Sequence, residues 1–353
     1  MTNEKYIRQI SLPNVGESGQ EKLSEARVLV VGCGGLGHAV LPYLASSGIG
    51  TVGIIDGDTV SKSNLHRQVL FSENDVGESK VEVAKSKLEQ QFPEVETLVL
   101  NEFLNGDNAL DLFKKFDVII DATDAIEVRY LINDACVLTK KPFVHASVYR
   151  FQFQVATFNY KSSGTYRCLY PNPPKTVQNC AEAGVMPSTV AMAGLYQANE
   201  VFKLILNIGD LILDKMLLID ALTNEQHQFQ YQKKDISFIT QDFFKKIYIE
   251  KKIKTISYNE AKKLDGLFLD VREKDELPKL ELENYMQIPL QELENNCSQI
   301  SKNPPVFIFC QSGKRSAKAF QLLKEKEFKN VYCLSDNAPE IEYEEKENSL
   351  YSG

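Results

Sequence analysis

The stretch Gly32-Cys33-Gly34-Gly35-Leu36-Gly37 decides the fold of the first half of this chain. It follows a β-branched and leucine run at 28–31, typical of a strand buried on both faces, and it opens a helical pattern at 36–47. Glycines at such a junction permit a tight turn and let backbone N–H groups approach a phosphate at the helix N-terminus. Gly32, Gly34, Gly35 and Gly37 are therefore candidate nucleotide contacts. The loop by itself leaves a dinucleotide and ATP both open.

The pattern of strand, helix and strand continues beyond this loop. Further strands are predicted at 51–55, 117–120 and 143–146, with helices at 107–115 and 128–138. This alternation implies right-handed crossovers and a mainly parallel sheet with helices on both faces, a Rossmann-like α/β fold. An alternating segment at 151–158 favours an antiparallel strand. A long helix at 187–206 and a late strand at 216–220 complete the pattern.

The composition changes after about residue 230, which predicts a second domain. Lysines punctuate residues 232–254, and we expect a solvated connector there, partly helical. A smaller α/β pattern follows, with strands at 267–271, 306–309 and 331–334 and helices at 259–264 and 316–325. The predicted organisation is a first domain at 1–231, a lysine-rich connector at 232–254 and a second domain at 255–353 that ends in a loose acidic tail.

Composition and charge exclude several classes of protein. The 353 residues include 40 basic and 48 acidic side chains, a net charge of −8, and no basic block, which argues against binding to nucleic acid or anionic membranes. No apolar run is long enough for a membrane helix, and the first residues lack a secretory signal pattern. The seven cysteines are scattered, which fits free thiols in a reducing compartment, so we expect a cytoplasmic protein.

A polar and cationic group of residues follows the second and third strands. Such residues suit a triphosphate better than a dinucleotide, because Arg and Lys neutralise phosphate charge and stabilise departing pyrophosphate. A carboxylate at the end of the second strand can accept hydrogen bonds from ribose, and one after the next buried strand can hold Mg²⁺. The candidates are Asp56, Asp58, Asn64, Arg67, Gln68, Lys80 and Asp124.

These motifs together resemble the MoeB/ThiF family, the ubiquitin-activating-enzyme-like adenylyltransferases that activate ubiquitin-fold sulfur carriers. The resemblance covers roughly 4–231 and rests on Arg8-Gln9, GCGGLG, DGD at 56–58, SNLHRQ at 63–68, Lys80, DATD at 121–124 and CAEAGVMPS at 180–188. It implies that Asp56 binds ribose, that Asn64, Arg67 and Lys80 contact the triphosphate, and that Asp124 handles Mg²⁺. It also implies a homodimer in which Arg8 reaches the neighbouring subunit's ATP site.

Two cysteines of the first domain bear on this resemblance. The family commonly holds a structural zinc with two C-x-x-C pairs, but only Cys168 stands at the first pair and no cysteine lies in 221–234. One thiol cannot build a tetrahedral site, so we expect no zinc. Cys180 precedes the long helix, where related enzymes can link to the carrier or relay sulfur. The alternative is a small apolar side chain that packs at the helix start.

Cys310 begins the loop Cys310-Gln311-Ser312-Gly313-Lys314-Arg315-Ser316 between a buried strand and a helix. Successive N–H groups and the helix N-terminus stabilise a thiolate or persulfide there. With LDVRE at 269–273 and IPL at 288–290, the loop resembles a rhodanese domain over roughly 255–335. This implies a persulfide on Cys310, with Asp270 and Arg272 as structural supports. The glycine pair usual after the last strand is Ser335-Asp336 here.

The two halves together predict one function. The first domain would adenylate the C-terminal glycine of a ubiquitin-fold sulfur carrier with ATP and Mg²⁺, and Cys310, loaded by an upstream persulfide donor, would supply sulfur to give the thiocarboxylate. The carrier is expected to be of the molybdopterin synthase small-subunit type, with the thiamine carrier as the alternative. An NAD-linked oxidoreductase and a non-catalytic carrier-binding module are the remaining alternatives, and Arg67 and Lys80 speak against the oxidoreductase.

Overall fold

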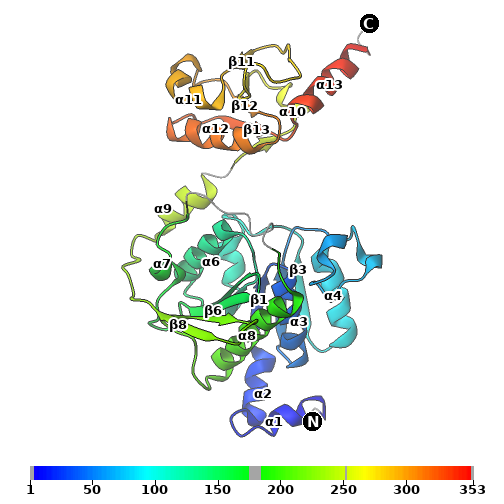
Figure 1. The fold of residues 1–353 in the computed structure, drawn as a ribbon, viewed down its shortest axis with the longest axis vertical. Coiled ribbons are helices and arrows are strands. Elements are labelled where there is room, and N and C mark those ends of the chain that lie inside the picture. Colours follow the sequence, from blue (N-terminus) through cyan, green and yellow to red (C-terminus); the bar gives the residue numbers. More distant parts are fainter. Residues whose placement is uncertain (1–3, 175–183, 251–252, 351–353) are drawn as a thin grey trace. The chain divides into compact units, whose positions relative to one another are not determined.

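The computed structural model describes residues 4–174, 184–250 and 253–350, which belong to two units, Met1–Ile249 and Glu250–Gly353 (Figure 1). Each unit has its own sheet and its own buried core. Within the described residues, no helix has both the length and the apolar character needed to cross a bilayer.

The first unit is built on one sheet of eight strands in the order β3-β2-β1-β4-β5-β6-β7-β8. The strands β3, β2, β1, β4 and β5 run parallel, and β6, β7 and β8 continue the sheet antiparallel. Their bounds are β1 Arg27–Val31, β2 Thr51–Ile55, β3 Glu96–Leu100, β4 Val118–Asp121, β5 Phe143–Tyr149, β6 Gln152–Phe158, β7 Lys215–Asp220 and β8 Gln226–Gln230.

Helices cover both faces of this sheet. The strand order changes direction between β1 and β4, and right-handed crossovers then place the helix after β1 and the helix after β4 on opposite faces. On one face α3 packs against α8, which lies over β5 and β6; on the other, α6 packs against α5 and β4. The bounds are α1 Ile7–Ile10, α2 Gly16–Glu25, α3 Gly35–Ser46, α4 Lys80–Gln91, α5 Ala109–Phe113, α6 Ile126–Thr139, α7 Tyr166–Leu169, α8 Pro187–Leu206 and α9 Gln241–Phe244.

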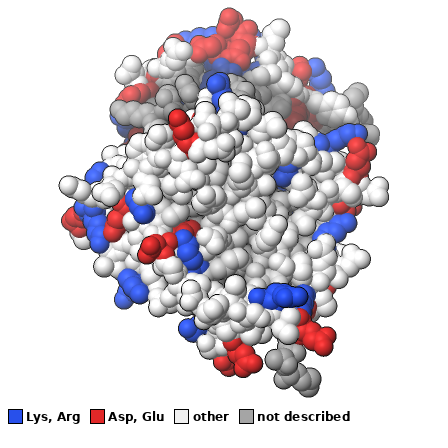
Figure 2. All heavy atoms as spheres, turned by 60° about the horizontal axis from the view of Figure 1, so that its bottom comes forward, with Lys and Arg blue, Asp and Glu red and all other residues white. Residues whose placement is uncertain are grey.

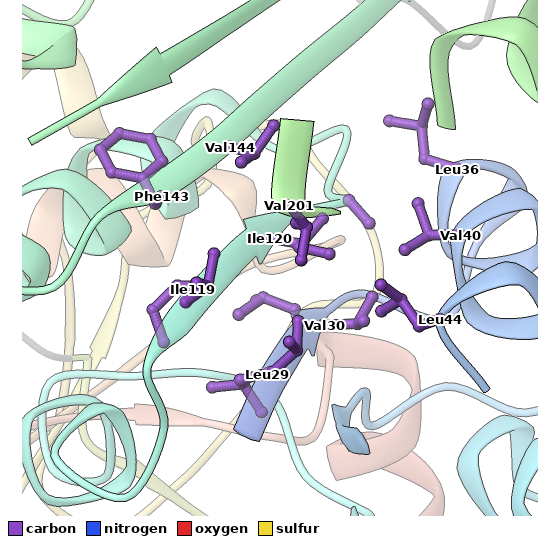
Figure 3. Close-up of a cluster of buried hydrophobic side chains, with 14 of the residues drawn as sticks. Leu29, Val30, Leu36, Val40, Leu44, Ile119, Ile120, Phe143, Val144 and Val201 are labelled. Atoms are coloured by element: carbon purple, nitrogen blue, oxygen red, sulfur yellow. The ribbon is translucent and has the colours of Figure 1, made fainter. Parts of the chain in front are cut away.

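The core forms because neighbouring parallel strands present matching rows of apolar side chains. The register pairs Val30 with Ile120 and Ile120 with Val144, so these three side chains form one row on one face of the sheet (Figure 3). The residues before them, Leu29, Ile119 and Phe143, form the row on the opposite face. Leu36, Val40 and Leu44 follow one another at a spacing of four along α3, which places them on one stripe of the helix (Figure 3).

The expected mainly parallel sheet, continued by antiparallel strands, is confirmed, while several of its elements were not predicted from the sequence. These include β3, α4 and β8. β3 lies at the sheet edge and is largely half-buried, and every residue of β8 is exposed. Strands of this kind lack the continuous apolar run that identifies a strand buried on both faces.

Part of the segment expected as a connector, 232–254, packs on the first unit. It contains α9 and a single π-helical turn at Lys245–Ile249. Phe244 is fully buried in the core of the first unit, and the Tyr248 hydroxyl donates to Asp134 of α6 at 2.6 Å. Two well-spaced aromatic side chains therefore anchor this lysine-rich stretch.

The second unit has five parallel strands in the order β11-β10-β12-β13-β9, which confirms the smaller α/β domain. Two clusters of buried side chains form its core. The bounds are β9 Thr255–Ile256, α10 Tyr258–Ala261, β10 Leu267–Asp270, β11 Tyr285–Gln287, α11 Leu290–Asn296, β12 Val306–Phe309, α12 Lys314–Glu325, β13 Val331–Leu334 and α13 Ala338–Leu350.

The acidic tail expected to be loose is instead helical in α13. Asn337 and Glu340 cap this helix reciprocally, because the Asn337 N–H donates to the Glu340 carboxylate at 2.7 Å and the Glu340 N–H donates to Asn337 at 3.1 Å. Ala338 and Ile341 are fully buried in the second unit. The helix cap and these two buried apolar side chains therefore order a segment that its net charge alone predicts to be disordered.

Candidate functional site

The glycine loop joins β1 to α3 with two very close backbone approaches. Gly32 has φ +102°, and a Cβ there would lie 2.8 Å from the Ala122 carbonyl oxygen. A Cβ at Gly37 would lie 2.5 Å from the Gly32 carbonyl oxygen. Only glycine fits both positions. A Cβ at Gly34 would meet only Gln68 Nε2, at 3.9 Å, so this glycine leaves open space at the start of α3. Gly34 is the N-cap of α3, and the N–H groups of a first helical turn have no partner within the helix, so they can bind a phosphate.

Asp56 follows β2 and is held against the glycine loop. One carboxylate oxygen accepts the Cys33 N–H at 2.6 Å and the other accepts the Asp58 N–H at 2.8 Å. A carboxylate offers about four acceptor sites, so two remain for ribose hydroxyls. Backbone N–H groups thus fix the orientation of the carboxylate that the sequence assigned to the sugar.

Lys80 is a nearly buried cation at the first position of α4. Its side chain is 6% exposed, and its ammonium lies 2.9 Å from the Asp58 carboxylate, which is half exposed. Its carbonyl lies beside the thiol of Cys33, which connects the base of α4 to the glycine loop. Burial and the nearby Lys80 charge lower the pKa of His38 to about 3, so that imidazole is neutral. Lys80 is therefore a pre-positioned positive charge at the base of the loop.

Gln68 and Arg67 border the same loop from the turn after Lys62–Asn64. The backbone N–H groups of both residues donate to the Asn64 carbonyl, which forms the turn. Gln68 is 2% exposed, and its side-chain carbonyl has no hydrogen-bond partner among the described residues. Arg67 lies beside Gly35, with Cγ 3.4 Å from the Cβ position of that glycine. The buried, unpaired amide oxygen of Gln68 suits a hydrogen-bond donor of a ligand, and the cationic Arg67 beside the start of α3 suits a phosphate.

Asp124 is exposed in the turn after β4, and the backbone of that turn touches Gly32 through Ala122. A network that sequence reasoning missed holds this turn. The Asp121 carboxylate is fully buried, and it accepts from Thr123 Oγ1 at 2.8 Å and from His145 Nδ1 at 2.7 Å. Arg129 donates to the Thr123 carbonyl at 3.2 Å.

The charges of this network follow from burial and contact. Burial opposes ionisation of Asp121, but the hydrogen bond from His145, the nearby charge of Arg129 and the hydrogen bond from Thr123 outweigh burial and lower the pKa of the carboxyl. Burial lowers the pKa of His145 despite its contact with Asp121. The pair is therefore an Asp carboxylate that accepts from a neutral imidazole. The signal in the sequence was the first Asp of DATD, whereas the motif predicted a role only for its last residue, Asp124.

The remaining candidates of the first unit lie apart from this group. Arg8 is exposed on α1, and no hydrogen bond or ion pair between described residues joins it to the glycine loop. Cys180 lies outside the described residues. Among described side chains, no group of three His, Cys, Asp or Glu could hold a metal ion. Cys168 is buried, and its sulfur accepts the N–H groups of Thr165 and Lys234, each at 3.4 Å.

Cys310 lies at the end of β12 and is 2% exposed. The Ser316 N–H points at its sulfur at 3.4 Å, and the Ser316 hydroxyl lies 3.6 Å away. Burial raises the pKa of this thiol, but hydrogen bonds from the Ser316 and Ser312 N–H groups, the Ser316 hydroxyl and the Arg315 N–H outweigh burial, so the pKa lies below its usual value. The loop thus stabilises a sulfur anion.

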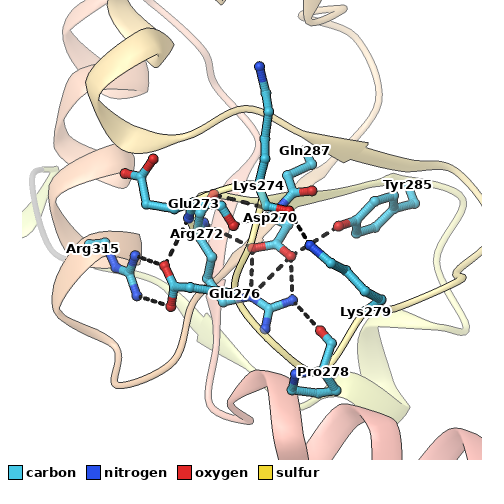
Figure 4. A network of polar contacts seen from close by, with 10 residues as sticks. All are labelled: Asp270, Arg272, Glu273, Lys274, Glu276, Pro278, Lys279, Tyr285, Gln287 and Arg315. Atoms are coloured by element: carbon cyan, nitrogen blue, oxygen red, sulfur yellow. Dashed lines mark hydrogen bonds and ion pairs between the residues drawn. The ribbon is translucent and has the colours of Figure 1, made fainter.

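One buried and one half-buried ion pair lie next to this loop (Figure 4). The Arg272 guanidinium contacts the Asp270 carboxylate through Nε at 3.0 Å and Nη2 at 2.7 Å, and both side chains are buried. Arg315, in the first turn of α12, forms a two-pronged ion pair with Glu276. The structural role expected for Asp270 and Arg272 matches this geometry, and Glu276 is a partner that sequence reasoning did not identify.

Comparison with known proteins agrees with both halves. The ThiF family model matches residues 6–237, and the rhodanese-like domain model matches residues 255–340. A Sus scrofa protein named adenylyltransferase and sulfurtransferase MOCS3 is 34% identical over 367 residues, which cover 91% of this chain and 80% of that protein. A sulfur carrier protein adenylyltransferase of Thermus thermophilus is 44% identical over 226 residues, which cover 62% of this chain and 83% of that protein.

Coverage is less complete for other relatives. The match to a Culex quinquefasciatus protein, also named adenylyltransferase and sulfurtransferase MOCS3, is 44% identical but spans about half of that protein's length. Among solved structures, E. coli MccB with ATP is 26% identical, with a TM-score of 0.59, and the match covers 67% of this chain and 74% of that one. The glycine loop, its buried lysine and the Cys310 loop therefore have a common explanation: this chain belongs to the ThiF family and carries a rhodanese-like domain after its ThiF unit.

Proposed function

We propose that this chain adenylates the C-terminal glycine of a ubiquitin-fold sulfur carrier and then transfers sulfur to it from a Cys310 persulfide. The observation that carries the proposal is the presence, in one chain, of a glycine loop with a buried lysine and a cysteine loop that stabilises a sulfur anion. The name of the pig relative favours both activities, and the name of the Thermus relative favours adenylation of a sulfur carrier. The fused sulfurtransferase unit favours a carrier of the molybdopterin synthase type over the thiamine carrier.

In the proposed adenylation, the carrier carboxylate attacks the α-phosphorus of ATP, and pyrophosphate leaves with the electrons of the broken P–O bond. Asp56 would hold the ribose, and Lys80, Arg67, Gln68 and Asn64 would contact the phosphates, with Asp58 orienting the Lys80 ammonium. Their role is positioning and stabilisation of the charge that develops on pyrophosphate.

Asp124 is the proposed ligand for Mg²⁺. An exposed carboxylate beside the glycine loop fits the usual mode of Mg²⁺, in which one or two carboxylates share the ion with substrate phosphates and water. When bound, the ion would neutralise phosphate charge. The buried Asp121, Thr123 and Arg129 contacts would keep the Asp124 turn in place.

In the proposed sulfur transfer, the outer sulfur of the Cys310 persulfide attacks the acyl-adenylate carbonyl, and AMP leaves. A second thiol then breaks the sulfur–sulfur bond, which releases the thiocarboxylate and leaves a disulfide on Cys310. Cys180 is the thiol that the sequence offers for this role. This chemistry needs free thiols, which agrees with the cytoplasmic location proposed from the sequence.

We also propose that the chain forms a homodimer through which Arg8 reaches a second nucleotide site. In support, Figure 2 shows a broad face with few charged side chains on the side where α1 and α2 lie in Figure 1. Exposed apolar residues occur on α1, α3 and α8 and between α1 and α2, and α2 and α3 both pack against α8. These residues are Ile7, Leu12, Tyr43 and Leu195. Light scattering of the purified chain tests the dimer.

Exchange of labelled pyrophosphate into ATP, with purified molybdopterin and thiamine carriers offered separately, tests adenylation. We expect exchange with the molybdopterin carrier. Lys80→Met should lower it by about 100-fold or more, because a buried cation at the phosphates is lost. Lys87→Met, on the same helix and half exposed, should leave the rate unchanged.

The outcomes separate the alternatives. Exchange with the thiamine carrier alone would replace the proposed carrier, and no exchange with either would contradict adenylation and favour a carrier-binding module. Full exchange by Lys80→Met would contradict the proposed site.

A further inference from the structure

A cavity of about 260 Å³ opens beside Cys310 in the second unit. Part of its lining is the cysteine loop itself, and the rest is the turn that joins β13 to α13. The lining residues from that turn and helix are Leu334, Ser335, Asp336, Asn337 and Glu340. Ser335-Asp336 stand at the positions where rhodanese domains usually carry two glycines. These two residues form part of the lining of the cavity that also contains the Cys310 sulfur.

The cavity lining carries two carboxylates and no cationic side chain. The Asp336 carboxylate accepts the Tyr258 N–H at 2.7 Å and the Ser335 hydroxyl at 2.9 Å. The Glu340 carboxylate accepts the Asn337 N–H at 2.7 Å. These neutral donors fix both groups in place without cancelling their charge. Within residues 253–346, whose side chains are described, no salt bridge joins either carboxylate to a Lys or Arg.

The cations near the loop do not offset these charges inside the cavity. Arg315 is committed to Glu276 and Arg272 to Asp270. Lys314 is exposed and does not line the cavity. The stabilisation of the Cys310 anion comes from backbone N–H groups and Ser316, which act on the sulfur at short range. Two carboxyl-bearing residues and the Cys310 sulfur therefore share one cavity, and no cationic side chain lines it.

We infer that Asp336 and Glu340 set the charge class of the sulfur donor, so that Cys310 is loaded by neutral or cationic alkyl persulfides and disfavours anionic donors such as thiosulfate. The inference rests on the proposed sulfur transfer and names its substrate class. In loading, the Cys310 thiolate attacks the outer sulfur of R–S–SH. A new sulfur–sulfur bond forms to Cys310, the old one breaks, and R–S⁻ leaves with its electron pair.

Thiosulfate undergoes the same exchange with sulfite as the leaving group, but it brings two negative charges toward two carboxylates and a thiolate. Like charges that share a partly desolvated cavity repel more strongly than they do in bulk water. A cationic persulfide experiences the opposite sign of interaction with the same two side chains.

Asp336→Asn, Glu340→Gln and the double variant of the full chain test this. Each amide keeps a carbonyl oxygen that can accept the same N–H group, so the turn and the helix cap should persist. Glu342→Gln is the matched control, because it removes a charge from the same helix outside the cavity lining. Persulfide formation on Cys310 is followed by mass spectrometry with two donors, thiosulfate and cysteamine persulfide, whose ammonium group carries a positive charge.

We expect wild type to load faster from cysteamine persulfide than from thiosulfate. In the double variant, kcat/KM for thiosulfate should rise about tenfold, because the two carboxylate charges that repel the dianion are removed. The rate with cysteamine persulfide should stay the same or fall, and Glu342→Gln should change neither rate.

An unchanged thiosulfate rate in the double variant, or an equal rise in Glu342→Gln, would overturn the charge filter while leaving sulfur transfer intact. By contrast, wild type that loads from neither donor, or a Cys310→Ser variant that transfers sulfur as well as wild type, would refute the proposed sulfur transfer and the inference with it.

Discussion

The Cys310 sulfur shows how a few short contacts decide the reactivity of one residue. Burial alone would keep its thiol protonated, as it does for Cys333, whose pKa burial raises to about 12. The two residues lie on adjacent strands of one sheet, yet only Cys310 has N–H groups of a helix N-terminus directed at its sulfur. Of these two cysteines, Cys310 is therefore the one that forms a thiolate more readily.

This contrast predicts a pH dependence. Because the pKa of Cys310 is lowered, its thiolate persists to lower pH, and its alkylation by iodoacetamide should reach a plateau at a lower pH than that of an ordinary cysteine. Ser316→Ala keeps the N–H group but removes the hydroxyl contact, so the midpoint should move to higher pH. Cys297, whose pKa burial raises, is the internal comparison. Peptide mass spectrometry at each pH measures both residues, and equal midpoints for Cys310 and Cys297 would contradict the assignment.

At the scale of elements, a buried cluster joins α6, α7 and the segment after α9. Arg167 contacts both carboxylate oxygens of Asp134, at 2.6 and 2.7 Å, and lies over the ring of Tyr130. The Tyr248 hydroxyl donates to the same carboxylate at 2.6 Å. Cys168, next to Arg167, accepts the Lys234 N–H from the chain that follows β8. Hydrogen bonds and an ion pair thus connect α7 to segments that the sequence places far apart.

Removal of Arg167 should therefore destabilise the first unit strongly. Arg167→Met leaves the Asp134 carboxylate buried without its cation, and we expect a loss of about 3–5 kcal/mol in the free energy of unfolding. Tyr248→Phe removes one hydrogen bond and should cost about 1–2 kcal/mol. Urea denaturation of the full chain measures both, with Lys161→Met, an exposed lysine of the same unit, as the control. A change for Arg167→Met no larger than that of the control would contradict a stabilising role for this cluster.

The same elements show what the sequence could predict. β1, α3 and β12 were predicted because continuous apolar runs, glycines and helical spacing coincide there. The glycine loop, Asp56 and Lys80 were placed near one another because the ends of parallel strands meet at one edge of a sheet. The Asp121–His145 pair was not predicted. Those residues are 24 positions apart, and only the register of β4 against β5 brings them together.

Side-chain burial also escaped the sequence analysis. Phe244 and Tyr248 are isolated aromatic residues among lysines, and a sparse pattern carries no periodicity from which a buried face can be inferred. Asp336 and Glu340 were seen only as a departure from a motif and as part of an acidic tail. Their common place in the cavity of Cys310 depends on how the turn after β13 folds back on the cysteine loop.

At the scale of the whole molecule, two units with separate cores carry the two proposed chemistries in one chain. Covalent linkage makes the second step independent of protein concentration, because each acyl-adenylate has a persulfide tethered to it. Two separate proteins would react at the same rate only if their real concentrations were roughly millimolar. If the linkage serves sulfur transfer, dilution should slow thiocarboxylate formation when the two activities are on separate chains and leave it unchanged when they are on one chain.

A mixture of two impaired full-length variants measures the effect of this linkage. Lys80→Met keeps Cys310 but should form adenylate about 100-fold more slowly than wild type or slower still, and Cys310→Ser should form adenylate but carry no persulfide. Cys310→Ser alone should give no thiocarboxylate, and the residual rate of Lys80→Met alone is subtracted; the mixture should add to it a rate that falls with dilution. At micromolar protein we expect the mixture to be about 10²-fold slower than wild type, whose rate per chain should not change with dilution. Thiocarboxylate formed on the carrier is measured by mass spectrometry at several protein concentrations. A mixture that matches wild type at every dilution would show that sulfur does not pass within one chain.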